Sequence, residues 1–96
     1  MIVARKPNKL PGKLIKKKYE LEYGTNTLAI QKKSIEKFHK FSVIDDVLAT
    51  GGTAKCVSEL LVSEGKEITG YSVVIELKSL KGRDNLIKPV NSQLLI

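Results

Sequence analysis

The sequence predicts an α/β domain organised around a parallel β-sheet, and three patterns indicate this fold class. The apolar run at residues 41–44 lacks alternation, as is typical of a strand buried on both faces of a parallel sheet. Residues 53–63 carry apolar side chains at helical spacing, and a second β-rich run occupies residues 71–77. Together these runs predict a strand–helix–strand unit over residues 41–77.

Before this unit, residues 13–31 predict a β-hairpin or a long flexible ribbon. Apolar side chains recur there at every second position, and Gly24-Thr25-Asn26 favours a turn between the two arms. Upstream, Ile2–Ala4 is expected to end a short strand, and the prolines and glycine within residues 7–12 mark a loop. Residues 34–39 predict a short helical turn that leads into the first strand of the unit.

Capping residues set the expected ends of the helix. Thr53 is expected to cap its amino end, because a threonine hydroxyl accepts hydrogen bonds from N–H groups that have no partner within the helix. Gly65 is expected to stop it, since glycine readily adopts the left-handed conformation that ends many helices. The tail ends in the apolar residues 94–96, which predict an added edge strand or a patch that packs on a partner.

The composition favours one soluble cytoplasmic domain, residues 1–96. No apolar run approaches the roughly 20 residues of a membrane-spanning helix, and the start lacks the apolar region of a signal peptide. The single cysteine, Cys56, excludes an internal disulfide and is interpreted as a small buried hydrophobe rather than a nucleophile. His39 is interpreted as a surface residue, and no cluster of His, Cys and carboxylates predicts a protein-bound metal.

Positive charge is concentrated in the first part of the chain. The net charge is +7, and residues 1–40 hold 11 lysines and arginines against three glutamates. Such a segment is either a solvated surface or an attractive surface for a polyanion, whether a nucleic acid, an anionic membrane or a small phosphorylated substrate. Nucleic-acid binding ranks last, because the chain lacks clustered arginines and a basic stripe interleaved with aromatic residues.

The strongest indication of function is Val43–Thr53, which reads Val-Ile-Asp-Asp-Val-Leu-Ala-Thr-Gly-Gly-Thr. Two carboxylates follow an apolar run, and a loop of small residues then opens the helix. The free N–H groups of such a loop, together with the positive end of the helix dipole, suit a phosphate. The carboxylates suit sugar hydroxyls or a nearby magnesium ion, so the stretch predicts a ribose 5-phosphate site. A Walker-type loop fits less well, because no Gly-Lys-Ser/Thr follows the glycines.

This pattern resembles the phosphoribosyl diphosphate (PRPP) motif of the type I phosphoribosyltransferases. Three further segments resemble the adenine phosphoribosyltransferases within that family, in order and spacing. They are Arg-Lys-Pro-Asn-Lys-Leu-Pro-Gly at residues 5–12, Tyr-Glu-Leu-Glu-Tyr-Gly at 19–24 and Ser-Leu-Lys-Gly-Arg at 79–83. The resemblance extends from about Val3 to the last residue and implies a partial Rossmann-like fold that lacks the family's N-terminal strands.

The resemblance also implies roles for individual residues. Ribose hydroxyls and the 5-phosphate would be held by Asp45, Asp46, Ala49, Thr50, Gly51, Gly52 and Thr53. Glu22 and Tyr23 would lie on a closing loop, with Glu22 assisting proton movement at the purine nitrogen. Arg5, Lys6 and Lys9 would face the purine and diphosphate. The structural alternatives are a solvent-facing strand end, a helix cap with a tight turn, exposed hairpin residues and a basic surface loop.

The activity implied by the resemblance is the conversion of adenine and PRPP to AMP and pyrophosphate in purine salvage. Magnesium would arrive with PRPP, and the partner would be a second copy in a homodimer or a complementing N-terminal half. Because the family's upstream half carries the pyrophosphate loop and much of the base pocket, this chain alone is expected to be weakly active or inactive. The alternative is a non-catalytic PRPP- or nucleotide-binding remnant or regulatory module.

Overall fold

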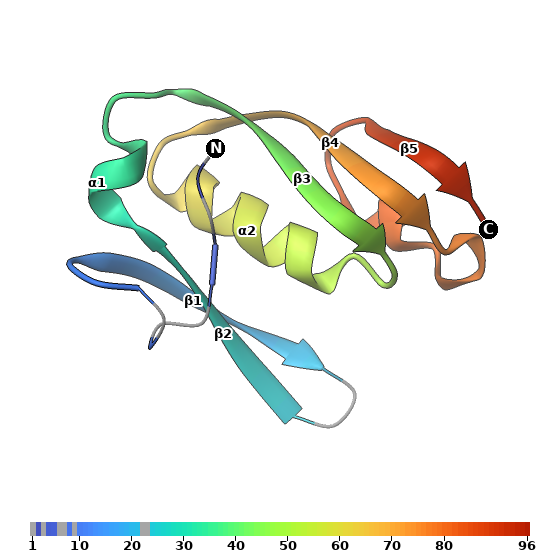
Figure 1. Ribbon diagram of the computed structural model, residues 1–96, viewed down its shortest axis with the longest axis horizontal. Coiled ribbons are helices and arrows are strands. Elements are labelled where there is room, and N and C mark those ends of the chain that lie inside the picture. Colours follow the sequence, from blue (N-terminus) through green and yellow to red (C-terminus); the bar gives the residue numbers. More distant parts are fainter. Residues whose placement is uncertain (1, 3, 6–7, 9, 22–23) are drawn as a thin grey trace.

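The fold has three layers: a β-hairpin, one long helix and a parallel β-sheet. The computed structural model describes residues 2, 4–5, 8, 10–21 and 24–96. Figure 1 shows helix α2 (Gly52–Ser63) lying between the hairpin and the sheet. The predicted α/β class with a parallel sheet is confirmed.

The predicted hairpin is present and consists of β1 (Leu14–Leu21) and β2 (Gly24–Gln31). The strands are antiparallel, with Leu14 opposite Gln31 and Leu21 opposite Gly24. Residues 28–30 of β2 are buried, whereas residues 24–25 are exposed. The base of the hairpin therefore packs into the core, and its far end extends into solvent.

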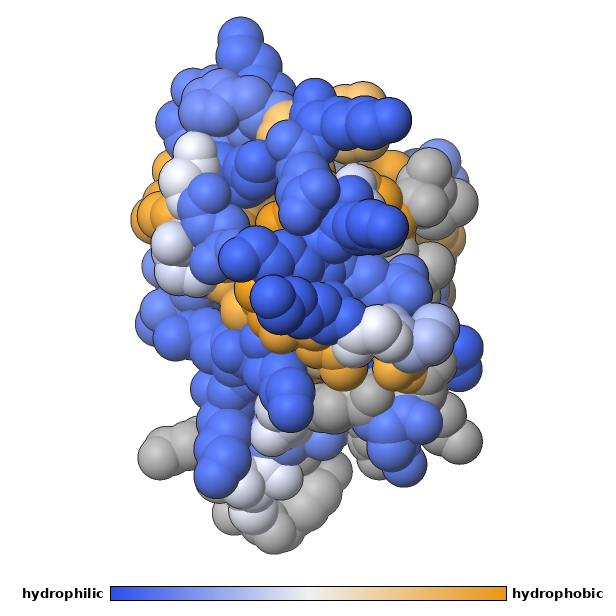
Figure 2. Space-filling model, turned by 90° about the vertical axis from the view of Figure 1, so that its left-hand side faces the viewer, coloured by the Kyte–Doolittle hydropathy of each residue, from blue (hydrophilic) through white to orange (hydrophobic). Residues whose placement is uncertain are grey.

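Lysines cover the outside of the hairpin and the short helix that follows it, α1 (Lys32–Ile35). Figure 2 shows this side of the molecule as mainly hydrophilic, with small apolar areas between the polar side chains. The exposed lysines are Lys16 and Lys18 of β1, Lys32 and Lys33 of α1, and Lys13, which directly precedes β1. The helical turn predicted at residues 34–39 begins earlier, at Lys32, and ends at Ile35, whose side chain is 2% exposed. It starts directly at the base of the hairpin, where the Lys32 N–H donates to the Lys13 carbonyl.

The sheet contains three parallel strands in the order β3-β4-β5. They are β3 (Lys40–Leu48), β4 (Glu67–Glu76) and β5 (Val90–Leu95). Helix α2 connects β3 to β4, and two short 3-10 helices, η2 (Lys78–Leu80) and η3 (Gly82–Asn85), precede β5. The expected edge strand at the tail is thus confirmed as β5. The expected stop at Gly65 is also confirmed, because this glycine has φ 78° and its N–H donates to the Val62 carbonyl.

The prediction that the first strand of the unit is buried on both faces is wrong for the described residues. Val43 and Leu48 of β3 are buried, but the Ile44 side chain is 69% exposed. The reason is that α2 packs against only one face of the sheet, so that Val74 of the central strand β4 is also 49% exposed. The strand is also longer than expected and includes Asp45 and Asp46.

The hydrophobic core lies between the three layers. Ile30 comes from the hairpin, Ile35 from α1, and the remaining members from the sheet and α2. The buried cluster consists of Ile30, Ile35, Val43, Ala54, Leu60, Leu61, Ile68 and Tyr71. Burial of these apolar side chains is the main force that joins the hairpin to the sheet. Over the described ranges, the structure contains no helix with both the length and the apolar character needed to cross a membrane.

Candidate functional site

A loop of small residues joins the carboxyl end of β3 to the start of α2. Gly51 has φ 87° and is the residue before the helix, which begins at Gly52. The expectation that Thr53 caps the helix is therefore wrong, because the N-cap is Gly51, which has no side chain to make a capping hydrogen bond. Left-handed Gly51 instead turns the chain into the helix, and its carbonyl accepts the first helical bond from the Lys55 N–H at 2.9 Å. The N–H groups of the first turn have no acceptor within the helix.

Asp45 and Asp46 lie within β3, just before the loop. Asp45 is partly buried and Asp46 is exposed. The Asp45 Oδ1 accepts the Asp46 N–H at 2.8 Å, and the Asp46 Oδ1 accepts the Val47 N–H at 2.9 Å. These local bonds hold both carboxylates near the carboxyl end of the strand, which is where open parallel sheets bind ligands.

The two carboxyl groups titrate differently because their surroundings differ. Partial burial raises the pKa of Asp45 above its ordinary value. Hydrogen bonding with the Asp45 side chain, followed by the bond from the Val47 N–H, lowers the pKa of Asp46. Asp46 is therefore an anion and a hydrogen-bond acceptor at neutral pH.

A small pocket brings Asp45 and the loop together. It has a volume of about 70 Å³ and is lined by Asp45, Val73 and residues 47–54. Ala49, Thr50, Gly51, Gly52 and Thr53 all contribute to its wall, as the sequence predicts for a shared site. Asp46 does not line this pocket, so only the first of the two adjacent aspartates lies at its wall.

A larger apolar groove opens beside this pocket, between the hairpin, α1, β3 and α2. Its volume is about 580 Å³. Asp45 and Thr53 line both the groove and the small pocket. The groove continues along the edge of β3 that pairs with no described strand. Ile44 and Phe38 line it there and are 69% and 58% exposed.

Five of the other predicted site residues fall into two groups. Arg5 is exposed, and its backbone pairs with Ala29 through two hydrogen bonds of 3.0 and 2.7 Å. Glu22, Tyr23, Lys6 and Lys9 lie outside the described residues. Among the residues that are described, no three of His, Cys, Asp and Glu gather closely enough to hold a metal ion.

The residues that pack behind the loop were not among the predicted site residues. Arg83 donates two hydrogen bonds to the buried Glu76 carboxylate, and the Asn85 Nδ2 donates to the Thr50 carbonyl at 2.7 Å. Gly82 lies directly against Ala49 and Gly51. The sequence contains two signals of these contacts, a lone glutamate at the end of an apolar strand and the Lys-Gly-Arg segment at residues 81–83. Neither signal shows which residue the glutamate or the segment contacts.

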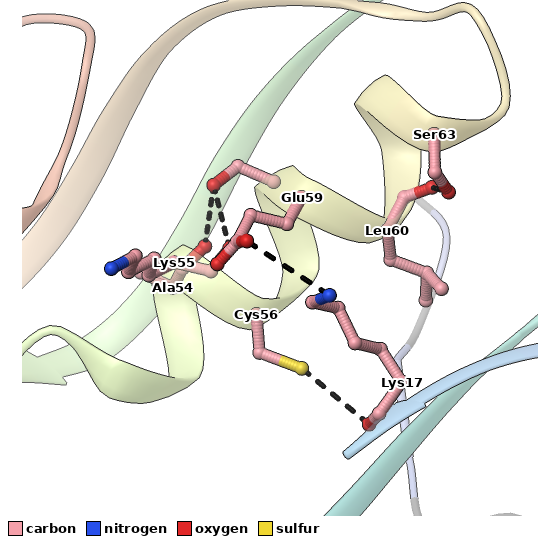
Figure 3. A network of polar contacts seen from close by, with 8 residues as sticks. Lys17, Ala54, Lys55, Cys56, Glu59, Leu60 and Ser63 are labelled. Atoms are coloured by element: carbon pink, nitrogen blue, oxygen red, sulfur yellow. Dashed lines mark hydrogen bonds and ion pairs between the residues drawn. The ribbon is translucent and has the colours of Figure 1, made fainter. Parts of the chain in front are cut away.

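Cys56 is a buried residue at the interface between α2 and the hairpin. Its side chain is 1% exposed, and its Sγ lies 3.6 Å from the Lys17 carbonyl oxygen. Figure 3 shows the Cys56 side chain pointing from α2 toward Lys17 of the hairpin. Burial raises the pKa of the Cys56 thiol, and the nearby Lys17 ammonium only partly opposes this effect. The expectation of a small buried hydrophobe is confirmed.

We expect Cys56 to resist alkylation in the folded protein. Both burial and the raised pKa reduce the amount of accessible thiolate, so iodoacetamide at pH 8 should react on the order of 100-fold more slowly than with the unfolded chain. Mass spectrometry of the chain with and without denaturant measures both rates. Equal rates would contradict the packing of α2 on the hairpin.

The comparisons with known proteins agree with this geometry. No protein-family model matches the chain. The adenine phosphoribosyltransferase of Prochlorococcus marinus strain MIT 9211 is 62% identical over 95 residues, which cover 99% of this chain and 55% of the relative. The chain thus spans about half the length of the curated relatives it matches.

Solved structures give the same result. The adenine phosphoribosyltransferase of Thermoanaerobacter pseudethanolicus superposes with a TM-score of 0.92 at 35% identity, covering 99% of this chain and 56% of that structure. The Saccharomyces cerevisiae enzyme, solved with adenine and an imino-altritol bisphosphate, superposes with a TM-score of 0.89 at 39% identity. Here the match covers 96% of this chain and 52% of that structure.

Proposed function

The chain belongs to the adenine phosphoribosyltransferase family, as a partial member, and we propose that it forms the part of such an enzyme that holds the ribose 5-phosphate of PRPP. The complete enzyme would convert adenine and PRPP to AMP and pyrophosphate, a phosphoribosyl transfer of purine salvage. The observation that carries the proposal is the pocket at the end of β3, which Asp45 shares with the loop 49–53.

The chemistry of this pocket suits a sugar phosphate. The free N–H groups at the start of α2 and the small residues of the loop provide donors and space for a phosphate. Asp45, at the wall of the pocket, provides an acceptor for a sugar hydroxyl, while Asp46 provides a second carboxylate just outside it. Magnesium prefers oxygen ligands and would enter bound to the oxygens of PRPP, close to these carboxylates.

Transfer also needs the purine and the pyrophosphate, and we propose that additional polypeptide supplies the rest of that site. The support is the open edge of β3 with the apolar groove beside it, because an unpaired strand edge and exposed Ile44 favour pairing with another segment. A complementing half would cover this edge and exclude water from the reacting centre. The 96-residue chain alone would then bind ribose 5-phosphate but transfer little or no phosphoribosyl group.

The test is the double variant Asp45→Asn/Asp46→Asn. We expect it to weaken ribose 5-phosphate binding on the order of 100-fold, because hydrogen bonds that involve a charged group contribute roughly 1.5–3 kcal/mol each. Isothermal calorimetry on the chain measures the affinity, and AMP formation from adenine and PRPP is measured after addition of the complementary half of a relative. Glu64→Gln, an exposed carboxylate at the other end of α2, is the control.

The single variants separate the two aspartates. Asp45 lines the pocket and Asp46 does not, so Asp45→Asn should cause the larger loss of affinity. Wild-type binding and activity in the double variant would refute the proposed function.

A further inference from the structure

The segment that follows β4 lies directly against the phosphate loop. Gly82, the first residue of η3, is buried there. A Cβ added to Gly82 would collide with the Ala49 carbonyl oxygen, and one added to Gly51 would lie 2.5 Å from the Gly82 carbonyl oxygen. Two backbones can approach this closely only where both lack side chains. The loop therefore has a rigid surface behind it.

A hydrogen bond attaches this segment to the centre of the loop. The Asn85 Nδ2 donates to the Thr50 carbonyl oxygen at 2.7 Å, across 35 positions in the sequence. In a trans peptide the C=O and the following N–H point in opposite directions. By holding the Thr50 carbonyl, Asn85 thus also determines the direction of the Gly51 N–H.

An ion pair attaches the same segment to the sheet. Arg83 Nε and Nη2 lie 2.7 and 2.5 Å from the two carboxylate oxygens of Glu76, which is 3% exposed. Ser92 of β5 also donates to Glu76, at 3.0 Å. Glu76 is the last residue of β4 and pairs with Leu48, the last residue of β3. The two hydrogen bonds from the Arg83 guanidinium therefore anchor η3 at the carboxyl ends of β3 and β4, where the loop begins.

We propose that Asn85 and Arg83 are positioning residues that hold the loop 49–52 in its phosphate-binding conformation. This inference rests on the proposed function for the identity of the ligand, a ribose 5-phosphate. Arg83 orients η3 on the sheet, Gly82 provides the contact surface, and Asn85 sets the orientation of the peptide between Thr50 and Gly51. The amide donors of the loop are then aligned before the ligand arrives, which reduces the cost of ordering them on binding.

The variant Asn85→Ala tests the proposal, because Asn85 is exposed and its loss leaves the core intact. We expect altered chemical shifts and faster hydrogen exchange at the Gly51 and Gly52 amides in the ligand-free protein. The dissociation constant for ribose 5-phosphate should rise about two- to tenfold, with an unchanged melting temperature. Asn91→Ala is the matched control, since Asn91 is also exposed and its side chain makes no hydrogen bond to any described residue.

The two readouts distinguish this inference from the proposed function. If the loop amides are altered in Asn85→Ala but the wild-type chain does not bind ribose 5-phosphate, the positioning role is supported and the proposed ligand is refuted. Loop amides identical to those of the wild type in Asn85→Ala would overturn the positioning role. The positioning role would also be overturned if the wild type binds ribose 5-phosphate and Asn85→Ala has the same dissociation constant.

Discussion

Gly51→Ala should destabilise the protein strongly and abolish ribose 5-phosphate binding. Gly51 has φ 87°, a left-handed conformation that costs an alanine roughly 1–2 kcal/mol. Its new Cβ would also lie 2.5 Å from the carbonyl oxygen of Gly82, a backbone atom that cannot rotate away. Such overpacking costs about 1–3 kcal/mol more. Because ~1 kcal/mol shifts the melting temperature of a domain of this size by roughly 4–8 °C, we expect a fall of more than about 10 °C.

Gly65→Ala is the matched control for this prediction. Gly65 has a similar φ of 78°, but an added Cβ would meet no atom within 4 Å. The variant therefore carries the conformational cost without the collision. Thermal unfolding followed by circular dichroism should show a clearly smaller fall than for Gly51→Ala. Equal falls would contradict the close approach of Gly51 and Gly82.

Gly52→Ala provides a second comparison within the same loop. Gly52 does not have a positive φ, and a Cβ there would meet only the Thr50 hydroxyl at 3.7 Å and the Tyr19 ring at 3.9 Å. These are ordinary contacts, so the melting temperature should stay close to that of the wild type. A large loss of stability would show that the loop is packed more tightly than the structure indicates.

Arg83→Met should lower the melting temperature at neutral pH by on the order of 10 °C. The substitution removes the partner of a carboxylate that is 3% exposed. It leaves Glu76 charged and buried, with Ser92 as the one remaining side-chain partner of its carboxylate among the described residues. Replacing both partners avoids this unpaired charge, so Glu76→Met/Arg83→Met should recover much of the lost stability. The matched control is Lys40→Met, because the Lys40–Glu67 pair is 4.0 Å long and exposed and should contribute little.

The pH dependence of the Arg83→Met effect follows from the pKa of Glu76. In the wild type, hydrogen bonding to Arg83 lowers this pKa below its ordinary value of 4.5. The pair therefore stabilises the protein above about pH 4.5, and this contribution is lost as the pH falls through the lowered pKa. In the variant, burial should instead raise the pKa of Glu76, so acid neutralises the unpaired charge and removes its cost.

The difference in melting temperature between wild type and Arg83→Met should consequently shrink as the pH is lowered from 7 toward 4. Unfolding curves of both proteins over this range measure it. A difference that is independent of pH would contradict a charged Glu76–Arg83 pair in the folded protein.

The local elements were predictable from the sequence because their signals lie within a few residues of each other. Alternating side chains indicate the hairpin, and apolar spacing with Gly65 indicates α2 and its end. The turn expected at Gly24-Thr25-Asn26 is wrong, because these residues belong to β2 and pair with the end of β1. The loop at residues 49–53 was predictable as well, since Asp45, Asp46 and the glycines follow one another directly. Its helix boundary was not, because Thr53 and Gly51 are both reasonable N-caps until the backbone conformation is known.

Contacts between distant segments could not be predicted in the same way. Nothing near Asn85 indicates Thr50, which lies 35 positions away, and Glu76 and Arg83 are opposite charges among many others in a lysine-rich chain. The exposure of Ile44 also depends on which face of the sheet α2 covers. An apolar strand has the same sequence whether a neighbour covers it or not.

The sequence by itself determined the family resemblance, the α/β class and the loop that predicts a ribose 5-phosphate site, because each of these is written in consecutive or periodically spaced residues. Only the tertiary structure decided that Asp45 rather than Asp46 lines the pocket, that η3 lies behind the loop, and that β3 is the first strand in the described sheet. These properties arise when the sheet and helix bring distant segments together, and packing between such segments has no signature in the local order of residues.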